Sequence, residues 1–288
     1  MQLNAGCELS FFAEAPTPLI LMLRPRSGAG QWIMREEYQI TPAVNITEFT
    51  DMYGNLCQRV VAPEGPFSIH FSATVQTADL IDTAPGAPYT PVEELPDDVL
   101  HYTLPSRYCQ SDQLGDLAAQ ITENVESGYD QAEAIRKWIN ETITYQYGTS
   151  NASTSAVDTA ASRVGVCRDF THLGISLCRA LNIPARMVVG YLYQLDPMDL
   201  HAWFEAYVDG RWFTFDATQE KPLGNRITVA YGRDAADVAF TTQFGQMTLN
   251  DMKVWVEAVN PEPGETEKKA DQAPTFASSI GSPNQIGN

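Results

Sequence analysis

Hydrophobic and polar positions alternate in the first part of the chain. Between residues 67 and 75 every second side chain is apolar, the period of a half-buried strand. The runs 19–26 and 32–40 are also rich in strand-forming residues, and Tyr53-Gly54-Asn55 between two such runs indicates a hairpin tip. We therefore expect residues 1–77 to form a small all-β, sandwich-like or barrel domain.

The next segment, residues 78–105, changes character. It carries two acidic pairs, Glu93-Glu94 and Asp97-Asp98, and five prolines at positions 85, 88, 91, 96 and 105. Proline removes a backbone donor and stiffens the chain, so this composition predicts an extended linker.

From about residue 106 the apolar spacing becomes helical. Apolar side chains recur at intervals of three and four over residues 114–125, 135–143 and 170–181, which predicts three amphipathic helices. Pro184 cannot continue the third helix. Strand-like runs then follow at 186–193, 200–208, 211–215 and 252–259. Helices followed by strands predict an α+β domain over residues 106–260.

Residues 261–288 contain few large apolar side chains, namely Phe276, Ile280 and Ile286. Such a segment buries too little surface to offset the entropy of ordering it, so we expect a disordered or surface-lying tail.

Composition narrows the function classes. The 288 residues are 44% hydrophobic, yet no run approaches the roughly 18 apolar residues of a membrane helix. The first 20 residues lack Lys and Arg, which disfavours a secretory signal. A net charge of −18 repels phosphate groups, so nucleic acid and anionic membranes are poor partners. We expect a protein or peptide substrate instead.

The five cysteines are odd in number and scattered, and no Cys-x-x-Cys pair occurs. This pattern disfavours both a disulfide framework and a structural zinc site. We expect free thiols, a reducing cytoplasmic setting, and neither a metal nor a cofactor.

Cys167 follows Gly165-Val166 where the third predicted helix begins. A thiol at a helix start faces unpaired N–H groups and the positive end of the helix dipole, which favours the thiolate. Asp169 in the same first turn opposes a second negative charge. The alternative is that Cys167 is a small buried hydrophobic side chain.

Asp209-Gly210 lies between two strand-like runs and predicts a two-residue hairpin turn. With this turn Val208 pairs with Arg211, and His201 and Asp216 become diagonal neighbours on one face, roughly 7–8 Å apart at Cα. An imidazole and a carboxylate span that distance, so the turn predicts a His–Asp pair. The alternative is a structural pair at a sheet edge.

A thiol, an imidazole and a carboxylate together supply a nucleophile, a base and a group that orients the base. This combination is typical of acyl transfer. It predicts that Cys167, His201 and Asp216 act on a carbonyl group.

Four segments are similar to the bacterial transglutaminase-like superfamily: Gly165-Val166-Cys167-Arg168-Asp169-Phe170, Leu181-Asn182-Ile183-Pro184, His201-Ala202-Trp203 and Phe215-Asp216-Ala217-Thr218. Leu23-Arg24-Pro25-Arg26 and Asp51-Met52-Tyr53-Gly54-Asn55 resemble the β-rich N-terminal domain of the same proteins. The resemblance covers residues 1 to about 260. It implies an α+β, papain/transglutaminase-like cysteine-protease core preceded by that domain, with Cys167 as nucleophile, His201 as general base and acid, and Asp216 as orienting acid.

Two positions depart from the expected patterns. Ala217 stands where the family often has proline, and Ala161 stands six residues before Cys167, where papain-type enzymes place a glutamine that stabilises the oxyanion. We expect the backbone N–H of Cys167 to donate to the oxyanion, with Tyr191 and Gln146 as candidates for the second donor. Trp203 and Tyr191 are our candidates for substrate binding.

Three kinds of function remain compatible with the residues. A cysteine protease or amidase is favoured, and transglutaminase-type amine transfer uses the same thioester chemistry. An arylamine N-acetyltransferase also uses Cys, His and Asp, but its nucleophile lies much nearer the N-terminus. A non-enzymatic interaction module of the same fold is the third possibility.

Overall fold

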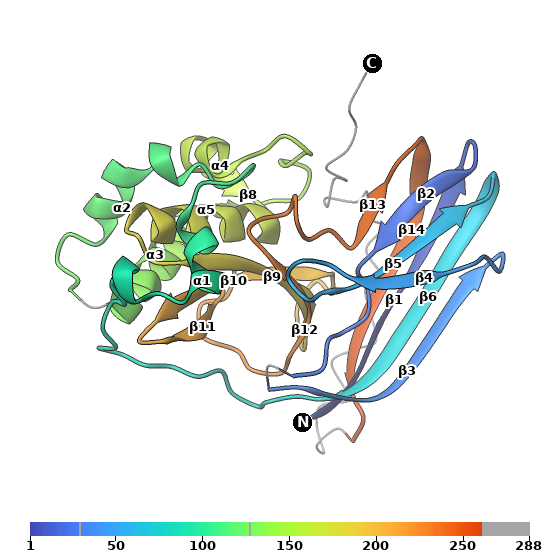
Figure 1. Ribbon diagram of the computed structural model, residues 1–288, viewed down its shortest axis with the longest axis horizontal. Coiled ribbons are helices and arrows are strands. Elements are labelled where there is room, and N and C mark those ends of the chain that lie inside the picture. The colour runs from blue at the N-terminus through green and yellow to red at the C-terminus, as the bar shows by residue number, and fades with distance from the viewer. Residues whose placement is uncertain (29, 127, 261–288) are drawn as a thin grey trace.

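The computed structural model describes residues 1–260 except positions 29 and 127. Figure 1 shows two domains side by side, one built from β-sheets alone and one in which helices cover a sheet. The tail expected over residues 261–288 lies outside the described residues. The mixed architecture confirms the predicted α+β core with an all-β domain.

The all-β domain consists of two four-stranded sheets with strand orders β14-β1-β6-β3 and β13-β2-β5-β4. Its strands are β1 (Gln2–Ala13), β2 (Thr17–Leu21), β3 (Trp32–Thr41), β4 (Thr47–Thr50), β5 (Leu56–Ala62), β6 (Gly65–Gln76), β13 (Thr241–Gln243) and β14 (Met247–Ala258). The alternation at 67–75 is confirmed as β6, whose apolar side chains point into the core. The expected hairpin tip joins β4 to β5, with Gly54 at φ +73°.

The last strand belongs to the first domain. We expected the strand near residues 252–259 within the 106–260 unit, but β14 pairs with β1 along almost its whole length. The short β13 likewise pairs with β2. Alternation shows that one face of a strand is buried without showing against which sheet, so the sequence pattern did not reveal this pairing. The α+β domain is therefore inserted between β6 and β13.

The segment 78–105 is more structured than an extended linker. It contains two 3₁₀ turns, η1 (Val92–Glu94) and η2 (His101–Thr103), and the short helix α1 (Asp97–Leu100). Leu95 and Val99 are buried against Tyr207. Apolar side chains between the prolines thus anchor this segment to the α+β domain.

In the α+β domain a four-stranded antiparallel sheet of order β11-β10-β9-β12 supports the helices. The remaining elements are η3 (Ser111–Gln113), α2 (Gly115–Ile121), α3 (Gly128–Thr142), β7 (Thr144–Tyr145), α4 (Ala156–Ser162), β8 (Val164–Gly165), α5 (Cys167–Ala180), β9 (Ala185–Leu192), β10 (His201–Val208), β11 (Arg211–Phe215) and β12 (Arg226–Gly232). Helix α5 lies against β10, where a Cβ on Gly174 would stand 2.4 Å from the Phe204 ring. The glycine permits this close approach, which brings the start of α5 to the start of β10.

Two amide side chains of the all-β domain hold the outer edge of β12. Gln31 donates to the carbonyl of Thr228 at 2.8 Å and accepts its N–H at 2.7 Å. Asn55 makes the same two-way contact with Tyr231, at 2.6 and 2.9 Å. Because an edge strand presents unpaired backbone groups, these contacts satisfy the edge and join the domains.

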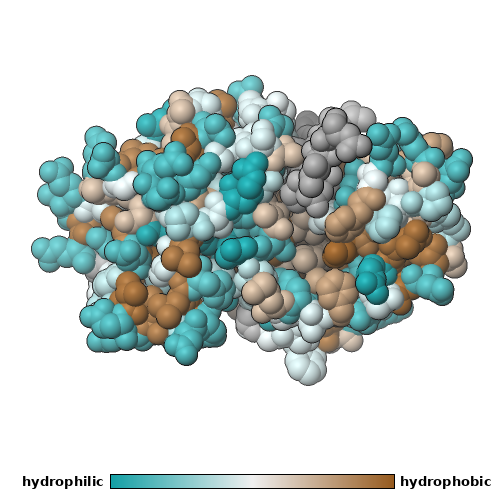
Figure 2. Space-filling model, turned by 45° about the horizontal axis from the view of Figure 1, so that its top comes forward, coloured by the Kyte–Doolittle hydropathy of each residue, from teal (hydrophilic) through white to brown (hydrophobic). Residues whose placement is uncertain are grey.

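The molecular surface in Figure 2 is largely hydrophilic, with separate hydrophobic areas over both domains. The exposed large apolar side chains of the all-β domain include Trp32, Met34 and Met52. No helix among the described residues is long and apolar enough to cross a membrane.

Candidate active site

Cys167 is the first residue of α5, as the sequence predicted. The carboxylate of Asp169, three residues after the N-cap residue Val166, accepts the Val166 N–H at 2.9 Å and so caps the helix start. A Cβ on Gly165 would stand 2.7 Å from Cβ of Asp169, so glycine is required here for the chain to approach its own cap.

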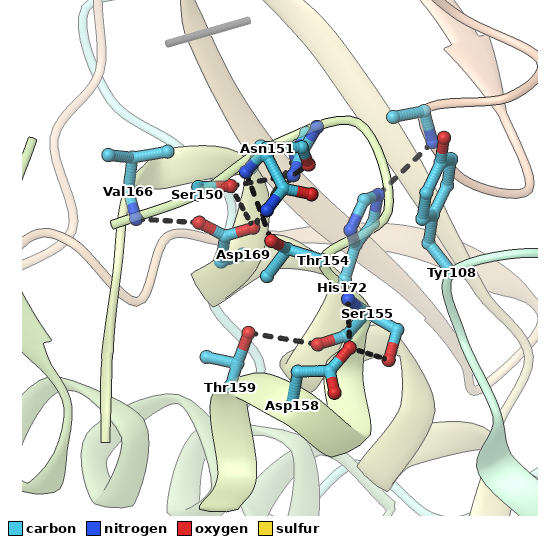
Figure 3. Close-up of polar contacts among 12 residues, drawn as sticks. Tyr108, Ser150, Asn151, Thr154, Ser155, Asp158, Thr159, Val166, Asp169 and His172 are labelled. Carbon is cyan, nitrogen blue, oxygen red and sulfur yellow. Dashed lines mark hydrogen bonds and ion pairs between the residues drawn. The ribbon is translucent and has the colours of Figure 1, made fainter. Parts of the chain in front are cut away.

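The same carboxylate ties the helix start to the preceding loop, as Figure 3 shows. Ser150 donates to Asp169 at 2.9 Å, and Arg168 donates to the Ser150 hydroxyl at 2.6 Å and to the Asn151 carbonyl at 2.7 Å. Asp169 and Arg168 are both buried. The network therefore fixes the position of Cys167 relative to the loop that follows β7.

His201 and Asp216 meet as the hairpin geometry predicted. Asp209 and Gly210 both have positive φ, +49° and +76°, and Val208 pairs with Arg211. His201 Nε2 lies 2.8 Å from Asp216 Oδ2, with both side chains buried. Because Nε2 faces the carboxylate, Nδ1 is the ring nitrogen left for other chemistry.

Asp216 is also held by two groups, Arg226 and Thr218, whose contacts with it no sequence pattern predicted. Arg226 Nη1 lies 2.8 Å from Asp216 Oδ2, and Thr218 donates to Oδ1 through its hydroxyl at 2.7 Å and its N–H at 3.0 Å. Burial favours the neutral acid, but the charges of His201 and Arg226 and these hydrogen bonds outweigh it and hold the pKa of Asp216 well below its usual range. The carboxylate is ionised at neutral pH.

The Cys167 thiol lies at the start of β10. The N–H of Ala202, the residue directly after His201, lies close enough to the thiol to favour its ionised form and so lower its pKa. Burial raises the pKa of this thiol to about 12, and the negative charges of Asp199 and Asp169 act in the same direction. Burial thus opposes the thiolate that the helix start was expected to favour.

Asp199, two residues before His201, contributes a second buried carboxyl group to this region. Burial raises its pKa to about 6, although its Oδ1 accepts the Leu200 N–H at 2.8 Å. It acts electrostatically on both the Cys167 thiol and the Tyr147 hydroxyl. The sequence carries no signal for Asp199, because a lone acid in a loop belongs to no pattern.

The two proposed substrate-binding residues are both buried, Tyr191 at the contact between the domains and Trp203 with its ring centre 6.0 Å from that of His201. Tyr191 is fully buried, and its hydroxyl lies 3.3 Å from the Leu23 carbonyl and 3.7 Å from Cys7 Sγ of the all-β domain. Trp203 packs among buried residues of the sheet, with the Arg226 guanidinium 4.9 Å from its ring centre. Both side chains are fully buried in the free protein, which argues against substrate contact by either and against Tyr191 as an oxyanion donor.

Within the described residues all five cysteines are free. The same part of the chain contains no cluster of three or more His, Cys, Asp or Glu side chains able to hold a metal ion.

Comparison with known proteins agrees with this arrangement. Residues 115–217 match the transglutaminase-like superfamily, and residues 16–77 match the bacterial transglutaminase-like N-terminal region. The first match contains Cys167, His201 and Asp216. The chain belongs to the transglutaminase-like superfamily.

Individual relatives extend the comparison over both domains. The crystal structure of a "putative cysteine protease" from Cytophaga hutchinsonii is 38% identical with a TM-score of 0.86, over 97% of this chain and 94% of that one. The uncharacterized protein ML0607 of Mycobacterium leprae is 27% identical over 236 residues, or 75% of this chain and 82% of that one. The uncharacterized protein Rv2569c of Mycobacterium tuberculosis is 34% identical over 111 residues, 33% and 35% of the two chains.

Proposed function

We propose that this protein is a cysteine-dependent acyl-transfer enzyme that hydrolyses peptide or carboxamide bonds. Cys167 is the nucleophile, His201 the general base and acid, and Asp216 the group that orients the imidazole. The observation that supports this best is the 2.8 Å contact of His201 with Asp216, combined with the closeness of the Cys167 thiol to the N–H of Ala202, the residue after His201. Superfamily membership and the similarity to the Cytophaga protein support the same chemistry.

In this proposal the reaction begins from the neutral thiol, since burial raises the pKa of the thiol. As the sulfur attacks the carbonyl carbon, its proton passes to Nδ1 of His201 and the carbonyl electron pair moves to oxygen. The imidazolium is stabilised by the ionised Asp216, which accepts a hydrogen bond from its Nε2–H. Collapse of the tetrahedral intermediate expels the amine, which takes the proton from His201, and leaves a thioester on Cys167.

Water then resolves the thioester with His201 as base, giving a carboxylic acid and the free thiol. A primary amine in place of water gives transamidation by the same steps. We favour water because the Cytophaga relative bears a protease name. Amine transfer is the second candidate.

Acylation by 4-nitrophenyl acetate, followed by intact-mass spectrometry and peptide mapping, tests the nucleophile. We expect one acetyl group on Cys167, none in Cys167→Ala, and a normal adduct in Cys178→Ala, which removes a thiol from the same helix. Acetylation that persists in Cys167→Ala would overturn the proposal.

Hydrolysis and amine transfer are separated by incubating a peptide library with and without hydroxylamine. We expect products carrying the mass of added water to dominate at neutral pH. Hydroxamates formed in preference to acids at millimolar hydroxylamine would favour the amine-transfer candidate. The absence of any acyl adduct and any product would favour the non-enzymatic module.

We also propose a peptide or protein substrate and a reducing, cytoplasmic location. The free thiols support the location, and the excess of acidic side chains argues against phosphate-rich partners. Fractionation of the source cells with a specific antibody tests the location, and recovery with secreted proteins would contradict it.

A further inference from the structure

The residues named so far supply only one hydrogen-bond donor to the oxyanion. The Cys167 N–H is one donor, but position 161 holds alanine and Tyr191 is buried at the domain interface. Trp203 also fails, although its indole N–H is buried without a partner, because the side chain lies in a cluster with Val188 and Tyr231. A second donor has to approach Cys167 from another element.

Tyr145 is the residue in that position. Strand β7 pairs in parallel with β8, placing Tyr145 opposite Gly165, two residues before Cys167. Backbone hydrogen bonds on both sides fix this register, from Thr144 N–H to Arg163 at 2.8 Å and from Gln146 N–H to Gly165 at 2.9 Å. The site and the tyrosine are therefore held by the same short sheet.

The ring of Tyr145 points at the helix start. Its centre lies 5.7 Å from that of Phe170, on the first turn of α5, and 5.4 Å from that of Tyr147. The Cys167 thiol and N–H and the Tyr147 hydroxyl all influence the pKa of the Tyr145 hydroxyl, which places that hydroxyl beside the helix start. The residue as a whole is 40% exposed, so it borders both solvent and the buried helix start.

We propose that the Tyr145 hydroxyl is the second oxyanion donor, a role that rests on the proposed function. In the free protein the hydroxyl oxygen holds the place of the substrate carbonyl oxygen at the Cys167 N–H. When sulfur attacks, a small rotation of the side chain brings the O–H and the N–H onto the same developing oxyanion. Burial, together with the nearby thiol and Tyr147, raises the pKa of Tyr145, so the phenol stays protonated as a donor.

Tyr145→Phe tests this by comparing two reactions of the same sulfur. Iodoacetamide alkylates at a saturated carbon and forms no oxyanion, whereas 4-nitrophenyl acetate acylates through a tetrahedral oxyanion. We expect the variant to alkylate within about threefold of wild type and to acylate about 100-fold more slowly, the loss that follows removal of one oxyanion donor. Tyr89→Phe, which removes a hydroxyl in the segment before η1, serves as the matched control and should change neither rate.

Other outcomes separate the possibilities. Unchanged or faster acylation would mean that the hydroxyl only blocks the site, and an equal fall in both rates would mean a structural role; either result overturns the proposal for Tyr145 alone. If wild type forms no acyl adduct at Cys167, the proposed function fails, and the role of Tyr145 fails with it. Thermal unfolding of both variants confirms that the comparison concerns folded protein.

Discussion

His201 and Arg226 share one oxygen of Asp216. The pairing of His201 with Asp216 follows from the Asp209-Gly210 turn, because the turn sets the register and the register sets the diagonal neighbours. No sequence pattern places Arg226 beside Asp216, because the loop between Asp216 and β12 shows no periodicity from which its path could be predicted. Local turn chemistry thus predicted the pair that a hairpin creates, and missed the cation that tertiary packing adds.

Removal of this cation should destabilise the protein in a pH-dependent way. Because the pKa of Asp216 is lowered on folding, its carboxylate contributes stability above its ordinary pKa of about 3.9, and this contribution is lost as the pH falls. We expect Arg226→Ala to cost about 3–5 kcal/mol at pH 7, as for a broken buried ion pair, and clearly less at pH 3. Urea unfolding at the two pH values measures the difference.

Arg186→Ala is the control for that experiment, because Arg186 pairs with Glu205 at 2.6 Å on the same sheet and makes no ion pair with Asp216. This pair is partly exposed, so we expect a smaller loss. An equal loss for Arg226→Ala at pH 3 and pH 7 would contradict the assigned role of the cation.

Asp199 changes the stability of the protein with pH in the direction opposite to Asp216. Its folded-state pKa, raised to about 6, lies above the unfolded value, so ionising this group costs stability as the pH rises from about 4 to about 6. Asp199→Asn should remove that cost, making the variant relatively more stable above pH 6 by up to about 3 kcal/mol. Urea unfolding of both proteins at pH 4 and pH 7 measures this, and a stability difference that does not change with pH would rule it out.

At the scale of elements, helices α4 and α5 begin with the same kind of cap. Asp158 accepts the Ser155 N–H at 2.9 Å, as Asp169 accepts that of Val166. Figure 3 shows both carboxylates, but only Asp169 also binds the Ser150 loop. The sequence located the start of α5 by its Gly-Val-Cys segment, whereas the link to residue 150 joins parts of the chain that no local pattern connects.

These caps offer a matched pair of variants. We expect Asp158→Ala to cost about 1 kcal/mol and Asp169→Ala about 2 kcal/mol or more, because the second change also leaves buried donors unpaired. Only Asp169→Ala should slow acylation of Cys167, since it releases the start of α5. Asp169→Asn keeps an acceptor at the cap and should recover part of the rate; equal acylation by all three variants would contradict a positioning role.

At the scale of the molecule, the two domains are joined through the edge of β12. Gln31 and Asn55 are both buried and each satisfies two backbone groups. Sequence patterns predicted two domains and the alternation of apolar residues in their strands. They did not predict these contacts, because residues nearly 200 positions apart share no periodic pattern.

Substitution of Gln31 or Asn55 should therefore weaken the contact between the two domains. We expect Gln31→Ala and Asn55→Ala each to cost about 2 kcal/mol or more, because two buried backbone groups lose their partner. The double variant should separate the unfolding of the domains into two calorimetric transitions. Gln39→Ala, an exposed position on β3, is the control, and a single unshifted transition in the double variant would show that other contacts hold the domains together.

The pairing of β1 with β14 has a consequence for biosynthesis. Strand β1 leaves the ribosome before the inserted domain and β14 leaves after it, so the nascent all-β domain carries an open edge while the entire inserted domain is translated. Vectorial folding, in which each domain completes before the next emerges, is thus unavailable to this topology. The β1 edge is therefore completed only after the inserted domain has been translated.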